Sequence, residues 1–105
     1  EGLEVKKCKR PLSGQEKIRG KLYHEFILLN DDNYGFFCKG CKLLGPGEVR
    51  RNVETNFRNC EVVECIDEPK LLQNILASKS NPPKYNIKTF SCQEWAEDQL
   101  SRAKQ

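Results

Sequence analysis

Two side chains in this sequence could together perform covalent chemistry: the thiol of Cys92 and the imidazole of His24, the only histidine. Cys92 directly follows Ser91, a residue type that often caps the start of a helix. A thiol in the first helical turn lies near unpaired N–H groups and the positive end of the helix dipole, which favours the nucleophilic thiolate. An imidazole within hydrogen-bond reach is a common base for such a thiol. The two residues therefore predict chemistry through a thioester or acyl-enzyme, provided that the fold brings them together.

Hydrophobic periodicity predicts the two elements that carry these residues. After Ser91, residues at helical offsets share one face with Cys92, namely Trp95, Ala96, Leu100 and Ala103. Cys92 is thus expected on the core side of a C-terminal helix. Residues 21–29 predict a strand, in which alternation places His24 on one face with Leu22, Phe26 and Leu28. If that face packs against the C-terminal helix, His24 points towards Cys92.

The remaining pattern predicts one α+β domain over residues 1–105, with a small antiparallel sheet packed against the C-terminal helix. Residues 1–20 are polar and irregular and are expected to form an N-terminal arm, held mainly by Leu12, Ile18 and Cys8. The turn formers at 30–33 predict a hairpin between 21–29 and 34–38. The expected order then continues with a loop at 40–47 and a segment at 48–59 that fits a short helix or an irregular strand, of which the helix is favoured. A strand at 60–66 and a helix at 68–79 capped by Asp67 follow.

Two segments resemble a known family. They are Tyr-His-Glu-Phe-Ile-Leu-Leu at 23–29 and Tyr-Asn-Ile-Lys-Thr-Phe-Ser-Cys-Gln-Glu-Trp-Ala-Glu at 85–97. In this order they resemble the circularly permuted papain-like group that includes NlpC-type and lecithin:retinol acyltransferase-like domains. The resemblance implies a permuted papain-like core in which Cys92 is the acyl-accepting nucleophile and His24 is its base. It also implies that backbone N–H groups at the helix start stabilise an oxyanion.

The sequence departs from that family at two points. Ser91 stands where the family usually has Asn, and the next strand carries no second polar ring to orient the base. Asn33, Tyr34 or Glu25 could take that orienting role, and the sequence does not choose among them.

The cysteine count offers a competing interpretation. Six cysteines in 105 residues are typical of an extracellular domain and permit three disulfides in 15 pairings. Cys92 could then be a half-cystine that ties the last helix to Cys8 or Cys60. In that case the chain would be a non-catalytic secreted binding or surface-active protein of the same fold.

Metal binding is a further alternative. Cys38, Cys41, Cys60 and Cys65 follow the spacing C-x2-C-x18-C-x4-C, which is close to that of structural zinc sites. Disulfides among these four are favoured outside the cell, so the main prediction contains neither a metal nor a cofactor.

Composition limits the classes of partner. The net charge of +3 comes from interleaved acidic and basic residues, so no nucleic acid is expected as a partner. The longest apolar run is Phe26 to Leu29, so no transmembrane segment is expected. The sequence lacks Met, as a mature secreted protein would after removal of its signal peptide. The expected function is a secreted cysteine hydrolase or acyltransferase-like protein, with its substrate or protein partner left open.

Overall fold

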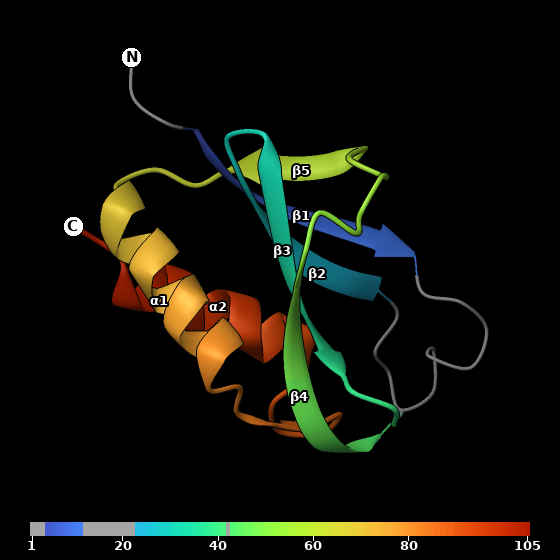
Figure 1. Cartoon of the computed structure of the whole chain (residues 1–105). Coiled ribbons are helices and arrows are strands. Elements are labelled where there is room, and N and C mark those ends of the chain that lie inside the picture. Colours follow the sequence, from blue (N-terminus) through green and yellow to red (C-terminus); the bar gives the residue numbers. More distant parts are fainter. Residues whose placement is uncertain (1–3, 12–22, 42) are drawn as a thin grey trace.

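The structure is a computed structural model that describes residues 4–11, 23–41 and 43–105. The described chain is an α+β fold in which a six-stranded antiparallel sheet, ordered β5-β1-β2-β3-β4-β6, packs against two helices (Figure 1). The strands are β1 (Val5–Pro11), β2 (Tyr23–Leu29), β3 (Asp32–Cys38), β4 (Leu44–Arg51), β5 (Asn59–Val62) and β6 (Lys84–Asn86). The helices are α1 (Glu68–Ser80) and α2 (Cys92–Arg102).

The β2–β3 hairpin is where sequence and structure agree best. Its turn consists of Asn30 and Asp31 alone, because Asp32 and Asn33 already belong to β3. Asn30 has φ 61°, a left-handed conformation that asparagine tolerates better than most residues. The predicted hairpin is confirmed, with a tighter turn than the four polar residues suggested.

The predicted N-terminal arm is wrong for its middle part. Val5–Pro11 forms β1, which lies between β2 and β5 in the sheet. Val5 and Cys8 are buried, whereas the intervening lysines keep their charged ends near carboxylates. Lysine stems can cover apolar surface while the ammonium stays paired or hydrated, so this strand lacks an apolar alternation. The arm contacts expected of Leu12 and Ile18 fall outside the described residues.

The second correction concerns residues 40–59. Leu44–Arg51 is strand β4, where a loop and then a helix were expected; its residues 47–51 pair with β3 and its residues 44–46 pair with β6. The sequence Gly45-Pro46-Gly47 is typical of a turn. In the structure, however, Gly47 lies in β4 at a close approach to Phe36 of β3 and to Pro83. A Cβ at Gly47 would lie 2.3 Å from the ring of Phe36 and 2.3 Å from the carbonyl oxygen of Pro83. Only glycine fits there, so the residue reflects packing rather than a turn.

The other predicted elements are present with modified bounds. The strand expected at 60–66 is the shorter β5, which is hydrogen-bonded to β1. Asp67 caps α1 by accepting a hydrogen bond from the backbone N–H of Lys70 at 3.1 Å. No helix within the described ranges is both long and apolar enough to cross a membrane.

The sheet has two different faces. One face carries Val5, Ile27, Leu29, Phe36 and Val49 and packs against the helices, with Trp95 of α2 stacked on Phe36 at 6.0 Å between ring centroids. By register, the opposite face carries Cys8, His24 and Phe26. The segment from 52 to 58 links β4 to β5 and covers part of this face, where Phe57 packs edge-on against Phe26 (Figure 1).

Candidate active site

Cys92 is the first residue of α2, as predicted, and its side chain is buried and free of any disulfide. The helix begins here because Ser91 and Glu94 form a capping box. Oε1 of Glu94 accepts hydrogen bonds from the backbone N–H of Ser91 at 2.9 Å and from its hydroxyl at 2.6 Å. Cys92 therefore lies in the first turn, where backbone N–H groups lack partners within the helix.

The start of α2 meets the sheet where β2 and β3 separate. The ladder between these strands covers only Ile27–Leu29 and their partners Asp32–Tyr34. Upstream of Ile27, the backbone of β2 makes no ladder with β3, and the carbonyl of Tyr23 instead accepts a hydrogen bond from the side-chain amide of Gln93 at 3.1 Å. This contact holds the first turn of α2 against the start of β2, which is paired with β1 there but not with β3.

This junction brings Cys92 and His24 together. Their side chains lie close enough for Cys92 to raise the pKa of the His24 imidazole, which is the proximity that the sequence analysis expected. The sequence analysis expected His24 on the face of β2 that packs on the helices. That face instead carries Glu25, Ile27 and Leu29. His24 belongs to the opposite face and meets Cys92 only because the strands part at this end of the sheet.

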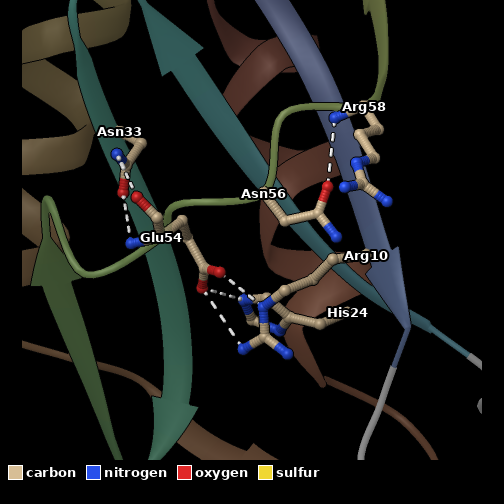
Figure 2. Close-up of polar contacts among 6 residues, drawn as sticks. All are labelled: Arg10, His24, Asn33, Glu54, Asn56 and Arg58. Atoms are coloured by element: carbon tan, nitrogen blue, oxygen red, sulfur yellow. Dashed lines mark hydrogen bonds and ion pairs between the residues drawn. The ribbon is translucent and has the colours of Figure 1, made fainter.

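The imidazole of His24 is enclosed by rings and by a carboxylate. Its side chain is 5% exposed, its ring stacks on Phe37 at 4.8 Å, and Phe26 lies on the same face at 6.0 Å. Nε2 lies 3.1 Å from Oε2 of Glu54, an ion-pair distance, although the N–H bond is not directed at that oxygen (Figure 2). A Cβ on Gly35 would approach Nε2 to 3.2 Å, so glycine leaves room beside the ring.

Glu54 is the residue that sequence reasoning missed. It lies in the irregular segment between β4 and β5, and its side chain is 3% exposed. Its carboxylate is ion-paired with Arg10 of β1 as well as with His24 (Figure 2). Burial alone would raise the pKa of Glu54, but the interactions of its carboxylate with His24 and Arg10 outweigh burial and lower the pKa to about 2. The group is therefore a carboxylate throughout the physiological range.

Asn33 fixes the backbone of Glu54. The amide oxygen of Asn33 accepts from the Glu54 N–H at 3.1 Å, and its amide nitrogen donates to the Glu54 carbonyl at 3.4 Å (Figure 2). Farther along the same segment, the side chain of Asn56 accepts from the Arg58 N–H at 3.1 Å and shapes a local turn. The side chain of Asn33 on β3 thus fixes the position of the irregular segment that contains Glu54.

The charge on His24 follows from these neighbours. Burial lowers the pKa of His24, while the neighbouring Cys92 and Glu54 side chains raise it, and the net result is a pKa above the ordinary 6.5. The site therefore favours a protonated ring placed between a thiol and a carboxylate. Such an arrangement places a possible acid and base next to a possible nucleophile.

The three residues considered for the orienting role lie elsewhere or act indirectly. Asn33 holds Glu54, Tyr34 belongs to the helix-side core, and Glu25 lies on the helix side 3.7 Å from Lys7. No sequence signal singled out Glu54, because an isolated glutamate between two strands has no characteristic spacing.

The other cysteines pair in two disulfides. Cys8 bonds Cys60 across the β1–β5 ladder, and Cys38 bonds Cys41 at the end of β3. The predicted alternative in which Cys92 pairs with Cys8 or Cys60 is wrong, since those two are joined to each other. The zinc alternative is wrong as well, because disulfides occupy Cys38, Cys41 and Cys60 and leave only Cys65 of that set as an exposed free thiol. Within the described ranges, no three potential metal ligands of the His, Cys, Asp or Glu type gather.

A groove of about 690 Å³ runs along α2 beside this site. Gln93 and Tyr23, the neighbours of Cys92 and His24 in sequence, lie at one part of its wall. The rest is dominated by charged side chains, namely Lys7, Lys9, Glu25, Glu94, Glu97 and Asp98. The surface next to the candidate site is therefore polar and carries both signs of charge.

Comparison with known proteins gives no relative for this chain: no protein-family model, curated protein or solved structure matches it.

Proposed function

We propose that this protein is a secreted cysteine hydrolase or acyltransferase-like protein built on a circularly permuted papain-like core. The observation that carries the proposal is the buried chain of contacts from Cys92 through His24 to Glu54. The strand that carries His24 precedes the helix that begins at Cys92, and this order of elements supports the fold assignment. The two disulfides are consistent with an oxidising compartment and support the secreted location.

In this proposal, Cys92 is the nucleophile, His24 is the acid and base, and Glu54 is a positioning residue. The Cys92 thiolate attacks a carbonyl carbon, and backbone N–H groups in the first turn of α2 stabilise the oxyanion. The imidazolium of His24 gives its proton to the leaving group as the carbon–heteroatom bond breaks, which leaves a thioester on Cys92. His24 then takes a proton from water or an acceptor alcohol, whose oxygen attacks the thioester and releases the thiolate.

The carboxylate of Glu54 contributes by favouring the charged ring. It holds a negative charge 3.1 Å from Nε2, while Arg10 and Asn33 hold the carboxylate and its backbone. A third group that orients the base is the usual completion of a nucleophile–base pair.

One observation favours the non-catalytic alternative. Cys92 is only 7% exposed, and a nucleophile must be reached by its substrate. In that alternative the protein is a secreted binding or surface-active protein in which the Cys92–His24 contact is structural. The two candidate functions therefore differ in whether the Cys92 thiol is reactive.

Alkylation of the non-reduced native protein, followed by intact mass and peptide mapping, separates them. We expect Cys92 to react with iodoacetamide faster than a thiol in the unfolded chain, and this advantage to vanish in His24→Ala. Cys65 provides the internal reference, because it is an exposed free thiol in the same molecule. A Cys92 that stays unmodified while Cys65 reacts would contradict the enzyme proposal.

An acyl-ester probe tests the chemistry itself. With p-nitrophenyl acetate, a thioester at Cys92 would show as a mass increase of one acetyl group on the peptide that contains Cys92. Cys65→Ser should keep this adduct, whereas Cys92→Ser should lose it. Acetylation that persists in Cys92→Ser would assign the reaction to another group.

A further inference from the structure

The two disulfides differ in how the fold encloses them. Cys8 is fully buried, and the β1–β5 ladder places it directly opposite Cys60. Cys38 is the last residue of β3 and Cys41 lies beyond the strand, and both are partly exposed. Because thiol–disulfide exchange needs access to a sulfur atom, a thiol in solution reaches the Cys38–Cys41 bond more readily than a bond with one fully buried cysteine.

The two disulfides also differ in what their reduction would cost the fold. Cys8–Cys60 joins residues at a sequence separation of 52, so it strongly restricts the unfolded chain and contributes correspondingly to stability. Cys38–Cys41 spans a separation of only 3 and restricts the unfolded chain much less. The protein is therefore expected to stay folded in both redox states of Cys38–Cys41.

The residues between the two sulfurs also favour exchange. Lys39 and Gly40 are both exposed, so neither covers the disulfide from the solvent side. The ammonium group of Lys39 belongs to the short ring that the disulfide closes, and a nearby positive charge favours the thiolate that exchange requires. Cys38 packs against the hydrophobic core, which leaves Cys41 as the sulfur for an incoming thiol to attack.

The same disulfide adjoins the candidate active site. Phe37, the residue before Cys38, stacks on His24 at 4.8 Å between ring centroids. On the other side, the sulfur of Cys41 packs against the backbone of β4, where a Cβ on Gly45 would lie 2.6 Å from it. The disulfide therefore links the end of β3 to a sulfur held against β4. Its opening removes this link one residue away from the ring that stacks on His24.

We propose that Cys38–Cys41 is a redox site that exchanges with low-molecular-weight thiols, and that its reduction alters the stacking of Phe37 on His24. A thiolate attacks the sulfur of Cys41, a mixed disulfide forms, and Cys38 leaves as a thiolate. A second thiol attacks the small-molecule sulfur of the mixed disulfide and releases Cys41. The protein disulfide is thus reduced to two thiols, which take up the protons of the two small thiols, and these are oxidised to one disulfide. The site does not depend on the reactivity of Cys92.

Timed reduction of the folded wild-type protein by reduced glutathione tests the exchange. Free thiols are trapped at intervals with N-ethylmaleimide and located by peptide mapping. We expect Cys38 and Cys41 to become modified at least about tenfold faster than Cys8 and Cys60, and their disulfide to form again when glutathione disulfide is added. Cys65→Ser removes the exposed free thiol and should leave this result unchanged.

NMR signals of the His24 ring protons test the link to the candidate site, since His24 is the only histidine. We expect these signals to shift on selective reduction, and the double variant Cys38→Ser/Cys41→Ser to show a similar shift without reductant. Lys39→Gln is the matched control, because it changes the same short ring of residues, keeps the disulfide and should leave the His24 signals in place. If the double variant fails to fold, the reduced wild-type protein still provides the measurement.

Four results would overturn the proposal. Two concern access: equal rates of opening for both disulfides, or a Cys38–Cys41 bond that resists glutathione until the protein unfolds. The third is a set of His24 signals that stays unchanged although peptide mapping shows Cys38 and Cys41 to be fully reduced. The fourth is loss of the exchange in Cys65→Ser, which would assign the attacking thiol to the protein itself.

Discussion

Replacing Glu54 with Gln removes one charge from the buried chain of contacts while keeping the side-chain shape. The pKa of Glu54 is about 2 against an ordinary 4.5, which corresponds to at most about 3 kcal/mol of folding free energy. The Arg10 side chain is 29% exposed, so water screens part of this interaction. Gln also retains a carbonyl acceptor for one of the two partners. We therefore expect Glu54→Gln to lower the free energy of unfolding by about 1–2 kcal/mol at pH 6.

The loss should depend on pH in a definite direction. The pKa of Glu54 is lower in the folded than in the unfolded chain, so its contribution is present above about pH 4.5 and disappears as the pH falls towards 2. The pKa of His24 is raised, so the stability it gains from its partners is present below its ordinary 6.5 and fades as the pH rises through the folded value. The cost of Glu54→Gln should therefore be greatest between these two limits and smallest at pH 2.

Urea unfolding at pH 2, 6 and 9, with both disulfides intact, measures these differences. The single histidine offers a second measurement, because its ring protons give one set of NMR signals to titrate. We expect the pKa of His24 to fall in Glu54→Gln. Glu48→Gln is the matched control, since Glu48 pairs with Arg50 on the same sheet face without contacting His24. An unchanged His24 titration, or an unfolding free energy equal to that of the wild type at pH 6, would refute the assigned role of Glu54.

Three further substitutions test how the fold supports the site. Removing the Cys8–Cys60 disulfide with a double Ser variant should cost about 4 kcal/mol in chemical unfolding, because the bond closes a separation of 52 residues. Ser91→Ala should cost about 1 kcal/mol and slow the alkylation of Cys92, since it removes the hydroxyl from the capping box; unchanged stability would argue against that cap. Gly47→Ala should cost about 2 kcal/mol in the same unfolding assay, because its Cβ would overlap a ring and a carbonyl oxygen; a stabilising effect would contradict this packing.

The parts of the fold that sequence could predict are those in which local pattern and tertiary environment agree. The β2–β3 hairpin has apolar strands around a polar turn, and α2 has a capping box followed by an apolar stripe. In both, neighbours in the sequence determine the structure. Cys92 could be placed at a helix start for the same reason.

The parts that sequence could not predict depend on distant partners. Lys7 lies in β1 on the helix side because Glu25 and Glu97 neutralise its ammonium group, and one of these is on α2. Gly47 lies in a strand because Phe36 and another loop leave no space for a side chain. Lysine is typical of exposed surface and glycine of loops, so the sequence alone predicts the wrong environment for both residues. Their positions depend on contacts that form only when the sheet is assembled.

The same reasoning explains why Glu54 reaches His24 from a segment without regular structure. The segment leaves β4 at Arg51 and enters β5 at Asn59, so the β3–β4 ladder anchors one end. The β1–β5 ladder and the Cys8–Cys60 disulfide anchor the other end. Between these anchors, Asn33 binds both backbone polar groups of Glu54. The carboxylate is thus positioned by the four strands β1, β3, β4 and β5, and reduction of Cys8–Cys60 should loosen it without any direct contact with Cys92.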